Sequence, residues 1–163
     1  MKTQSFFKTA LVAGLLAISG SSFAASSTVT TTFTGTVPNT CSMATGAVGA
    51  LGLSVDGKSM GSANTGGTLG SFTLTCTGTA NMSIAAPVPA AGTIALTNTA
   101  SLTKKSNLYA ATAPTVAIAT GDGVTNATSQ PSGTYNVDMS FISLTALAPG
   151  SYAASVITTV TPN

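Results

Sequence analysis

The sequence has 163 residues, of which 44% are hydrophobic and only 5% are charged. Every basic residue is a lysine, every acidic residue is an aspartate, and histidine is absent. The chain therefore lacks the usual general base and the imidazole metal ligand, which argues against most classes of hydrolase and metalloenzyme.

The N-terminus has the pattern of a secretory signal peptide. Lys2 and Lys8 give a positively charged start, an apolar core follows over residues 10–18, and small residues precede a cleavage point. The apolar core is too short for a transmembrane helix, and no later segment is long and apolar enough to span a bilayer. We therefore expect residues 1–24 to be a cleaved signal peptide, residues 25–163 to form a single mature domain, and the chain to have no membrane span.

Cleavage of the signal peptide would change the charge balance. Without Lys2 and Lys8, three lysines remain against three aspartates, so the net charge of the mature domain is close to zero. A basic surface that could bind nucleic acid or anionic lipid is therefore not expected.

The first predicted element of the mature chain is a strand over residues 28–37, which reads TVTTTFTGTV. Threonine and valine favour strands, and alternate side chains of a strand lie on opposite faces. The more apolar face consists of Val29, Thr31, Phe33, Gly35 and Val37. Such a strand can pair at the edge of its own sheet, or it can be donated to another molecule, and the alternation is compatible with both.

The two cysteines, Cys41 and Cys76, are predicted to form a disulfide, because an exported chain with an even number of cysteines normally pairs them. The alternative is that they are free, reactive or metal-binding. No histidine and no third cysteine is present to complete a metal site with them.

The remainder of the chain shows short alternating segments separated by turn residues. Strands are expected near 48–55, and over 70–78, 81–86, 92–97, 115–120, 134–145 and 152–161. The segment around Lys104 and Lys105 is interpreted as a polar linker, and Asp138 is expected to face solvent. The last two strands are expected to form a hairpin through Pro149 and Gly150. This pattern predicts an all-β fold, an antiparallel β-sandwich.

No group of residues in the sequence indicates catalysis or metal binding. The three aspartates are far apart, and the serines are too numerous to single out a serine–lysine pair. The Gly121-Asp122-Gly123 segment carries one carboxylate, whereas calcium loops usually carry several, so a turn is favoured. We expect no enzymatic activity, no catalytic residue, no metal and no cofactor.

The run FTGTVPNTC, residues 33–41, resembles the start of mature chaperone–usher pilins, which begin with an alternating strand that contains a small residue and is followed by a cysteine. The layout of the chain is also similar to that of spore coat protein U-like domains. The resemblance implies an immunoglobulin-like sandwich that lacks its last strand and that a neighbouring subunit completes by strand addition. It further implies that Val29, Thr31, Phe33 and Val37 insert into the neighbour, with Gly35 where the groove is shallow.

Together these observations predict a non-enzymatic structural subunit of a bacterial surface fibre, pilus or coat, exported through the periplasm and secreted or held at the cell surface. The expected partners are further copies of the chain and a periplasmic chaperone and usher. The alternative is a monomeric secreted binding module of adhesin type, which recognises a glycan or a surface protein and keeps the 28–37 strand in its own sheet.

Overall fold

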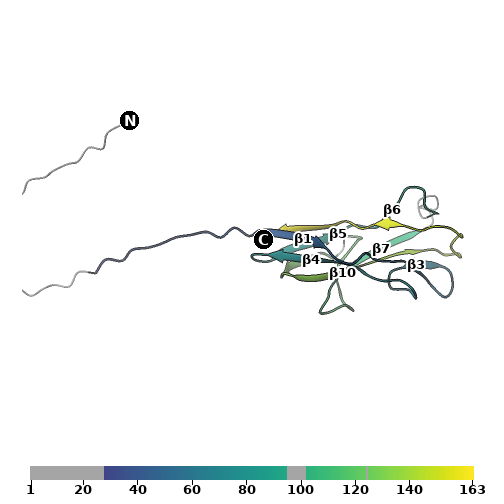
Figure 1. Cartoon of the computed structure of the whole chain (residues 1–163), viewed down its shortest axis with the longest axis horizontal. Helices are drawn as coiled ribbons and strands as arrows, with labels where there is room; N and C mark the ends of the chain where they lie inside the picture. The colour runs from purple at the N-terminus through teal and green to yellow at the C-terminus, as the bar shows by residue number, and fades with distance from the viewer. Residues whose placement is uncertain (1–27, 95–101, 124) are drawn as a thin grey trace, which may run out of the picture. The chain divides into compact units, whose positions relative to one another are not determined.

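The structure, a computed structural model, describes residues 28–94, 102–123 and 125–163. The chain divides into two units, Met1–Gly35 and Thr36–Asn163. The second unit is the folded domain, and all of its strand pairings are antiparallel (Figure 1). The predicted all-β class is confirmed.

The strands are distributed over three sheets. The largest has seven strands: β1 (Cys41–Thr45), β2 (Gly52–Leu53), β3 (Ser59–Gly61), β4 (Gly70–Cys76), β7 (Thr103–Ala110), β8 (Ala117–Thr120) and β10 (Gly133–Ile142). A second sheet contains β5 (Ala80–Ile84), β9 (Ala127–Gln130) and β12 (Thr158–Pro162), and a third contains β6 (Val88–Pro89) and β11 (Ala154–Ser155).

Strand β10 holds the large sheet together. It pairs with β7 over most of its length, with β4 over its first half and with β3 at its end. Its alternating pattern explains this position, because Tyr135 and Phe141 are almost completely buried while Thr134 on the opposite face is exposed.

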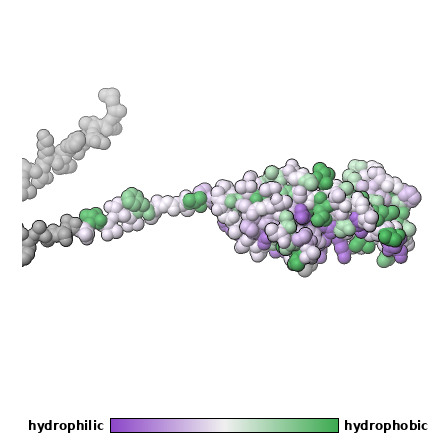
Figure 2. Space-filling view, turned by 60° about the horizontal axis from the view of Figure 1, so that its bottom comes forward, coloured by the Kyte–Doolittle hydropathy of each residue, from purple (hydrophilic) through white to green (hydrophobic). Residues whose placement is uncertain are grey.

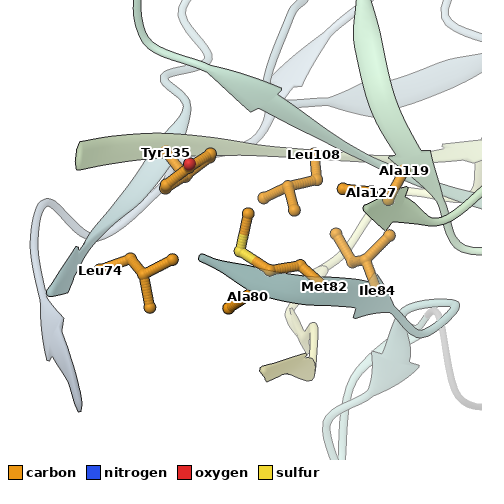
Figure 3. Packing of buried hydrophobic residues seen from close by; sticks show 8 residues of the cluster. All are labelled: Leu74, Ala80, Met82, Ile84, Leu108, Ala119, Ala127 and Tyr135. Carbon is orange, nitrogen blue, oxygen red and sulfur yellow. The ribbon is translucent and has the colours of Figure 1, made fainter. Parts of the chain in front are cut away.

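The main hydrophobic core combines side chains of the two larger sheets (Figure 3). The large sheet contributes Leu74, Leu108, Ala119 and Tyr135, and the three-stranded sheet contributes Ala80, Met82, Ile84 and Ala127. A smaller cluster around Leu102 and Phe141 includes the half-buried Met139 and Tyr152. Among the residues that the structure describes, no helix has the length and apolarity needed to cross a bilayer.

The predicted hairpin of the last two strands is wrong. The segment after Pro149 and Gly150 does not return to β10, because β11 pairs with β6 and β12 pairs with β5. After β10, the backbone amides of Ser143 and Leu147 donate hydrogen bonds to carbonyls in the turn between β2 and β3. The chain then crosses to the other two sheets. A tight turn was therefore insufficient evidence that its flanking strands are neighbours.

The interpretation of the segment around Lys104 and Lys105 as a polar linker is also wrong, since both lysines lie in strand β7. Ser106 and Leu108 are buried, and the Ser106 hydroxyl donates a hydrogen bond to the Ala85 carbonyl at 2.7 Å. The lysines interrupt the apolar pattern without preventing pairing along β10. Of the strand expected at 92–97, residues 92–94 form no strand and the others lie outside the described residues.

Asp138 is buried rather than solvent-facing, with an exposed fraction of 9%. Its carboxylate accepts hydrogen bonds from the Ser62 hydroxyl and, at 3.3 Å, from the Asn107 side-chain amide. These donors compensate for the loss of hydration, because a buried charged group must be hydrogen-bonded to be tolerated.

Candidate functional site

The domain has an open groove of about 900 Å³. One wall is the segment 43–51, which consists of most of β1 and the residues that follow it, and the other wall is the segment 152–158. Between the walls lies a floor made by side chains of the large sheet: Met60, Phe72, Val137 and Met139. The groove thus lies over strands β3, β4 and β10.

The groove is mainly apolar. Alanine, valine, methionine, leucine, phenylalanine and glycine account for most of its lining, and none of the described residues that line it is charged. The Ser62 hydroxyl is already engaged, since it donates to Asp138 and accepts from the Met139 amide at 3.1 Å. Figure 2 shows that hydrophobic residues are interspersed with weakly and strongly hydrophilic residues over the face of the domain that it presents.

Strand β1 presents an unpaired backbone edge to this groove. Among the strands that the structure describes, β1 pairs only with β4, and none occupies its other edge. Cys41 lies opposite Cys76 with a Cα–Cα distance of 4.2 Å, which is typical of a non-hydrogen-bonded pair in an antiparallel ladder. The two kinds of pair alternate along the ladder, so Met43, two residues further along, also belongs to a non-hydrogen-bonded pair. Its backbone N–H and C=O therefore face away from β4 and are available to another strand.

Several apolar side chains that line the groove are half-exposed, although they lie on inward faces of their strands. Met43 and Leu74 are opposite each other and share a face of the sheet, yet Leu74 is completely buried and Met43 is 50% exposed. In the segment 152–158, Tyr152 and Val156 alternate with exposed residues but remain only half-buried. The groove therefore leaves several inward-facing apolar side chains partly exposed.

The wall that continues β1 lies very close to the start of β4. Ala50 and Thr68 exchange two backbone hydrogen bonds, of 3.0 and 2.9 Å, and a Cβ atom at Gly49 would lie 2.9 Å from the Gly70 nitrogen. Glycines therefore permit the close approach that keeps this wall attached to the sheet.

The predicted disulfide is confirmed. Cys41 and Cys76 are joined, they are the first residue of β1 and the last residue of β4, and they are direct neighbours in the ladder. The bond therefore fixes the register of β1 against β4 at one end of the groove wall.

The five residues predicted to contact a partner are all exposed. The exposed fractions of Val29, Phe33 and Val37 are 89%, 89% and 84%, and Thr31 and Gly35 are exposed as well. Residues 28–40 form no strand, so the strand expected at 28–37 is not present in the described part of the chain.

The resemblance implied a groove, but the sequence did not identify the residues that line it. Five of its lining residues lie within the strands expected over 70–78, 134–145 and 152–161: Phe72, Val137, Met139, Tyr152 and Val156. The alternating pattern of these strands contains no signal that these side chains would stay partly uncovered. Strand β1 was missed because its sequence, CSMAT, is too short and polar to show an alternation.

Below the groove floor, the only strongly buried carboxylate among the described residues is Asp138, and it is engaged as described above. Burial, and after it the charge of Asp138, raises the pKa of Tyr109. Within the described part of the chain, no three residues of the histidine, cysteine, aspartate and glutamate types are grouped so as to hold a metal ion.

The chain was compared with protein-family models, curated proteins and solved structures, and none of them matches it at a significant level.

Proposed function

We propose that this chain is a non-enzymatic structural subunit of a bacterial surface fibre, pilus or coat, and that its copies assemble by β-strand donation. In this proposal the domain is an immunoglobulin-like sandwich without its last strand. The segment 28–37 of one copy fills the groove of the next. The observation that carries the proposal is the coexistence, on one chain, of an apolar groove beside a strand edge that no described strand occupies and of an exposed alternating segment.

The dimensions of the two surfaces support the proposal. A strand rises about 3.3 Å per residue, so residues 28–37 would span about 33 Å when extended, and the wall 43–51 is of similar residue length. The donated strand would satisfy the free backbone groups of β1, and its apolar face would cover the half-exposed side chains of the floor.

The chemistry of the groove also suits this segment. The lining described above has no charged residue, and the face formed by Val29, Thr31, Phe33, Gly35 and Val37 carries no charge either. The opposite face consists of threonines, which would stay in contact with water. A strand with one apolar and one hydroxyl face is suited to complete a sheet that is buried on one side.

Export of such a chain requires protection of the groove before assembly. An exposed apolar groove next to a free strand edge favours aggregation. A periplasmic chaperone that inserts its own strand, together with an usher that exchanges it, would supply this protection, and both are part of the proposal.

We expect the exported full chain to migrate as a ladder of heat-sensitive oligomers. Strand donation adds backbone hydrogen bonds along the whole groove and buries apolar side chains, so the contact should survive SDS at room temperature and break on boiling. Electrophoresis of boiled and unboiled periplasmic extract measures this. A single monomer band before boiling contradicts strand donation and supports the monomeric binding module.

A charge at Met43 is expected to weaken assembly. Burying a methionine contributes about 1.5–3 kcal/mol, so Met43→Asp should raise the dissociation constant between copies at least tenfold. Because Met43 is 50% exposed in the single chain, the unfolding midpoint should change little. The matched control is Ser42→Asp, which places the same charge on the exposed opposite face of β1. Equal assembly of the two variants would exclude the groove as the acceptor.

A further inference from the structure

The residue that joins the N-terminal segment to β1 is held by an unusually complete set of hydrogen bonds. The Asn39 side-chain amide donates to the Thr79 carbonyl at 2.6 Å and to the Asn163 carbonyl at 2.8 Å. Its oxygen accepts from the Gly78 amide at 2.9 Å. We call this arrangement the Asn39 clamp, and it ties the start of β1 to the β4–β5 connection and to the end of β12.

The clamp is also tightly packed. A Cβ atom at residue 78 would lie 3.1 Å from the side-chain amide atoms of Asn39, so glycine at this position allows the close approach. Asn163 adds its own bonds, from its backbone amide to the Thr79 carbonyl at 3.0 Å and from its side chain to the Thr79 hydroxyl at 3.1 Å.

The neighbours of Asn39 extend the pairing of β1 beyond its first residue. Thr40 donates its amide proton to the Thr77 hydroxyl at 3.0 Å, and the Thr77 amide donates to the Thr40 carbonyl at 3.1 Å. The Thr77 hydroxyl in turn donates to the Pro38 carbonyl at 3.0 Å. Residues 38–40 are therefore held along the line of β1 rather than in a turn.

This arrangement opposes insertion of the segment into the groove of its own molecule. To lie beside the free edge of β1, the segment 28–37 would have to reverse direction at residues 38–40, as in a hairpin with a loop of two to five residues. The bonds of the clamp would have to break for this turn to form. Proline at 38 also favours an extended conformation at Val37, so an earlier turn is disfavoured and would remove Val37 from the inserted face.

We infer that the Asn39 clamp is a specificity-determining device that keeps the 28–37 segment out of its own groove and leaves it for a second copy. The inference rests on the proposed function, since it assumes that this segment fills a groove. Because the segment and the groove are different surfaces of one chain, their contact between copies is head-to-tail, and such contacts extend into open filaments unless the rotation closes. The clamp would thus favour a filament over a monomer whose groove is filled by its own segment 28–37.

The test replaces the clamp by a favourable turn. Asn39→Asp combined with Thr40→Gly removes both amide donors of the clamp and gives residues 38–40 the Pro-Asp-Gly sequence of a three-residue hairpin loop. This loop would place Val37 opposite Cys41, so that the face with Phe33 enters the groove. The full chain with both changes is expected to be a folded monomer. A synthetic peptide of residues 26–38 then reports on the groove, with the Phe33→Asp chain as the reference for an open groove.

In the double variant, the segment 28–37 of the same molecule competes with the peptide for the groove at an effective concentration in the millimolar range. The double variant should therefore bind the peptide about a hundredfold more weakly than the reference. Adding Phe33→Asp to the double variant should expel the strand and restore peptide binding to the reference level. This triple variant also guards against misfolding, because a damaged domain would not regain binding.

The outcomes separate the two proposals. If the natural chain forms oligomers and the double variant forms them equally, the clamp inference is overturned and strand donation stands. If the triple variant fails to bind the peptide, the monomer arose from damage and the inference is again overturned. If the natural chain stays monomeric, the proposed function is overturned together with the inference that rests on it.

Discussion

Replacement of Phe33 by aspartate is expected to abolish assembly of the chain without lowering the stability of the domain. Phe33 is 89% exposed and lies outside the compact unit Thr36–Asn163, so its side chain contributes nothing to the fold of a single copy. In the groove of a second copy it would lose this exposure. Burying a phenylalanine contributes up to about 3 kcal/mol, and an unpaired buried carboxylate adds a larger penalty.

The loss should therefore exceed a thousandfold in the affinity between copies, and no oligomer ladder should remain. Light scattering measures the size of the purified variant, and thermal unfolding measures its stability. Thr32→Asp is the matched control, since it adds the same charge to the threonine face of the segment and should still assemble. If Phe33→Asp instead unfolds an isolated, self-sufficient monomer, the segment belongs to its own domain.

A mixing experiment tests the direction of the contact. The Phe33→Asp chain has a defective donor and an intact groove, whereas the Met43→Asp chain has an intact donor and a defective groove. Neither should assemble well alone, but an equimolar mixture should form a heterodimer and stop there, because the remaining donor and groove are both defective. Longer oligomers in the mixture would contradict donation from segment 28–37 to the groove beside β1.

The parts of the fold that could be predicted from the sequence are those in which one strand face packs into the core. Strands β4 and β10 were predicted because Leu74, Tyr135 and Phe141 alternate with polar residues, and burial of one face produces this alternation. Strand β7 was missed because Lys104 and Lys105 interrupt the pattern. Its existence depends on pairing along β10, which is a long-range contact that no local pattern reports.

Of the candidate site, the residues of the donor face could be identified from the sequence, whereas the residues of the groove could not. The donor face from Val29 to Val37 is a local alternation, and its residues could be identified from the sequence. The groove is a tertiary property, because it depends on which strand lies next to β1 and on where the chain crosses after β10. The incorrect hairpin prediction would have placed segment 152–158 beside β10 and left no second wall for the groove.

The disulfide is expected to have the largest effect on the stability of the domain. Cys41 and Cys76 are separated by 35 residues, and closing a loop of this length restricts the unfolded chain by about 4 kcal/mol in the chain-entropy model. Strand β1 depends on this bond more than other strands do. Of the described strands it pairs with β4 alone, and four of its five side chains are exposed, so little buried apolar surface holds it in place.

The variant with both Cys41→Ala and Cys76→Ala should therefore lose about 4 kcal/mol in its free energy of unfolding, measured by urea denaturation of the full chain. Hydrogen exchange should be accelerated in β1 before it is accelerated in β10, because detachment of β1 does not require the core to open. The control is Ser42→Ala with Thr75→Ala, which changes the adjacent exposed pair and keeps the disulfide. Since β1 forms one wall of the groove, the cysteine variant should also assemble poorly at temperatures where its core is still folded. Unfolding and assembly that match those of the control would show that the ladder with β4 alone is sufficient to hold this wall.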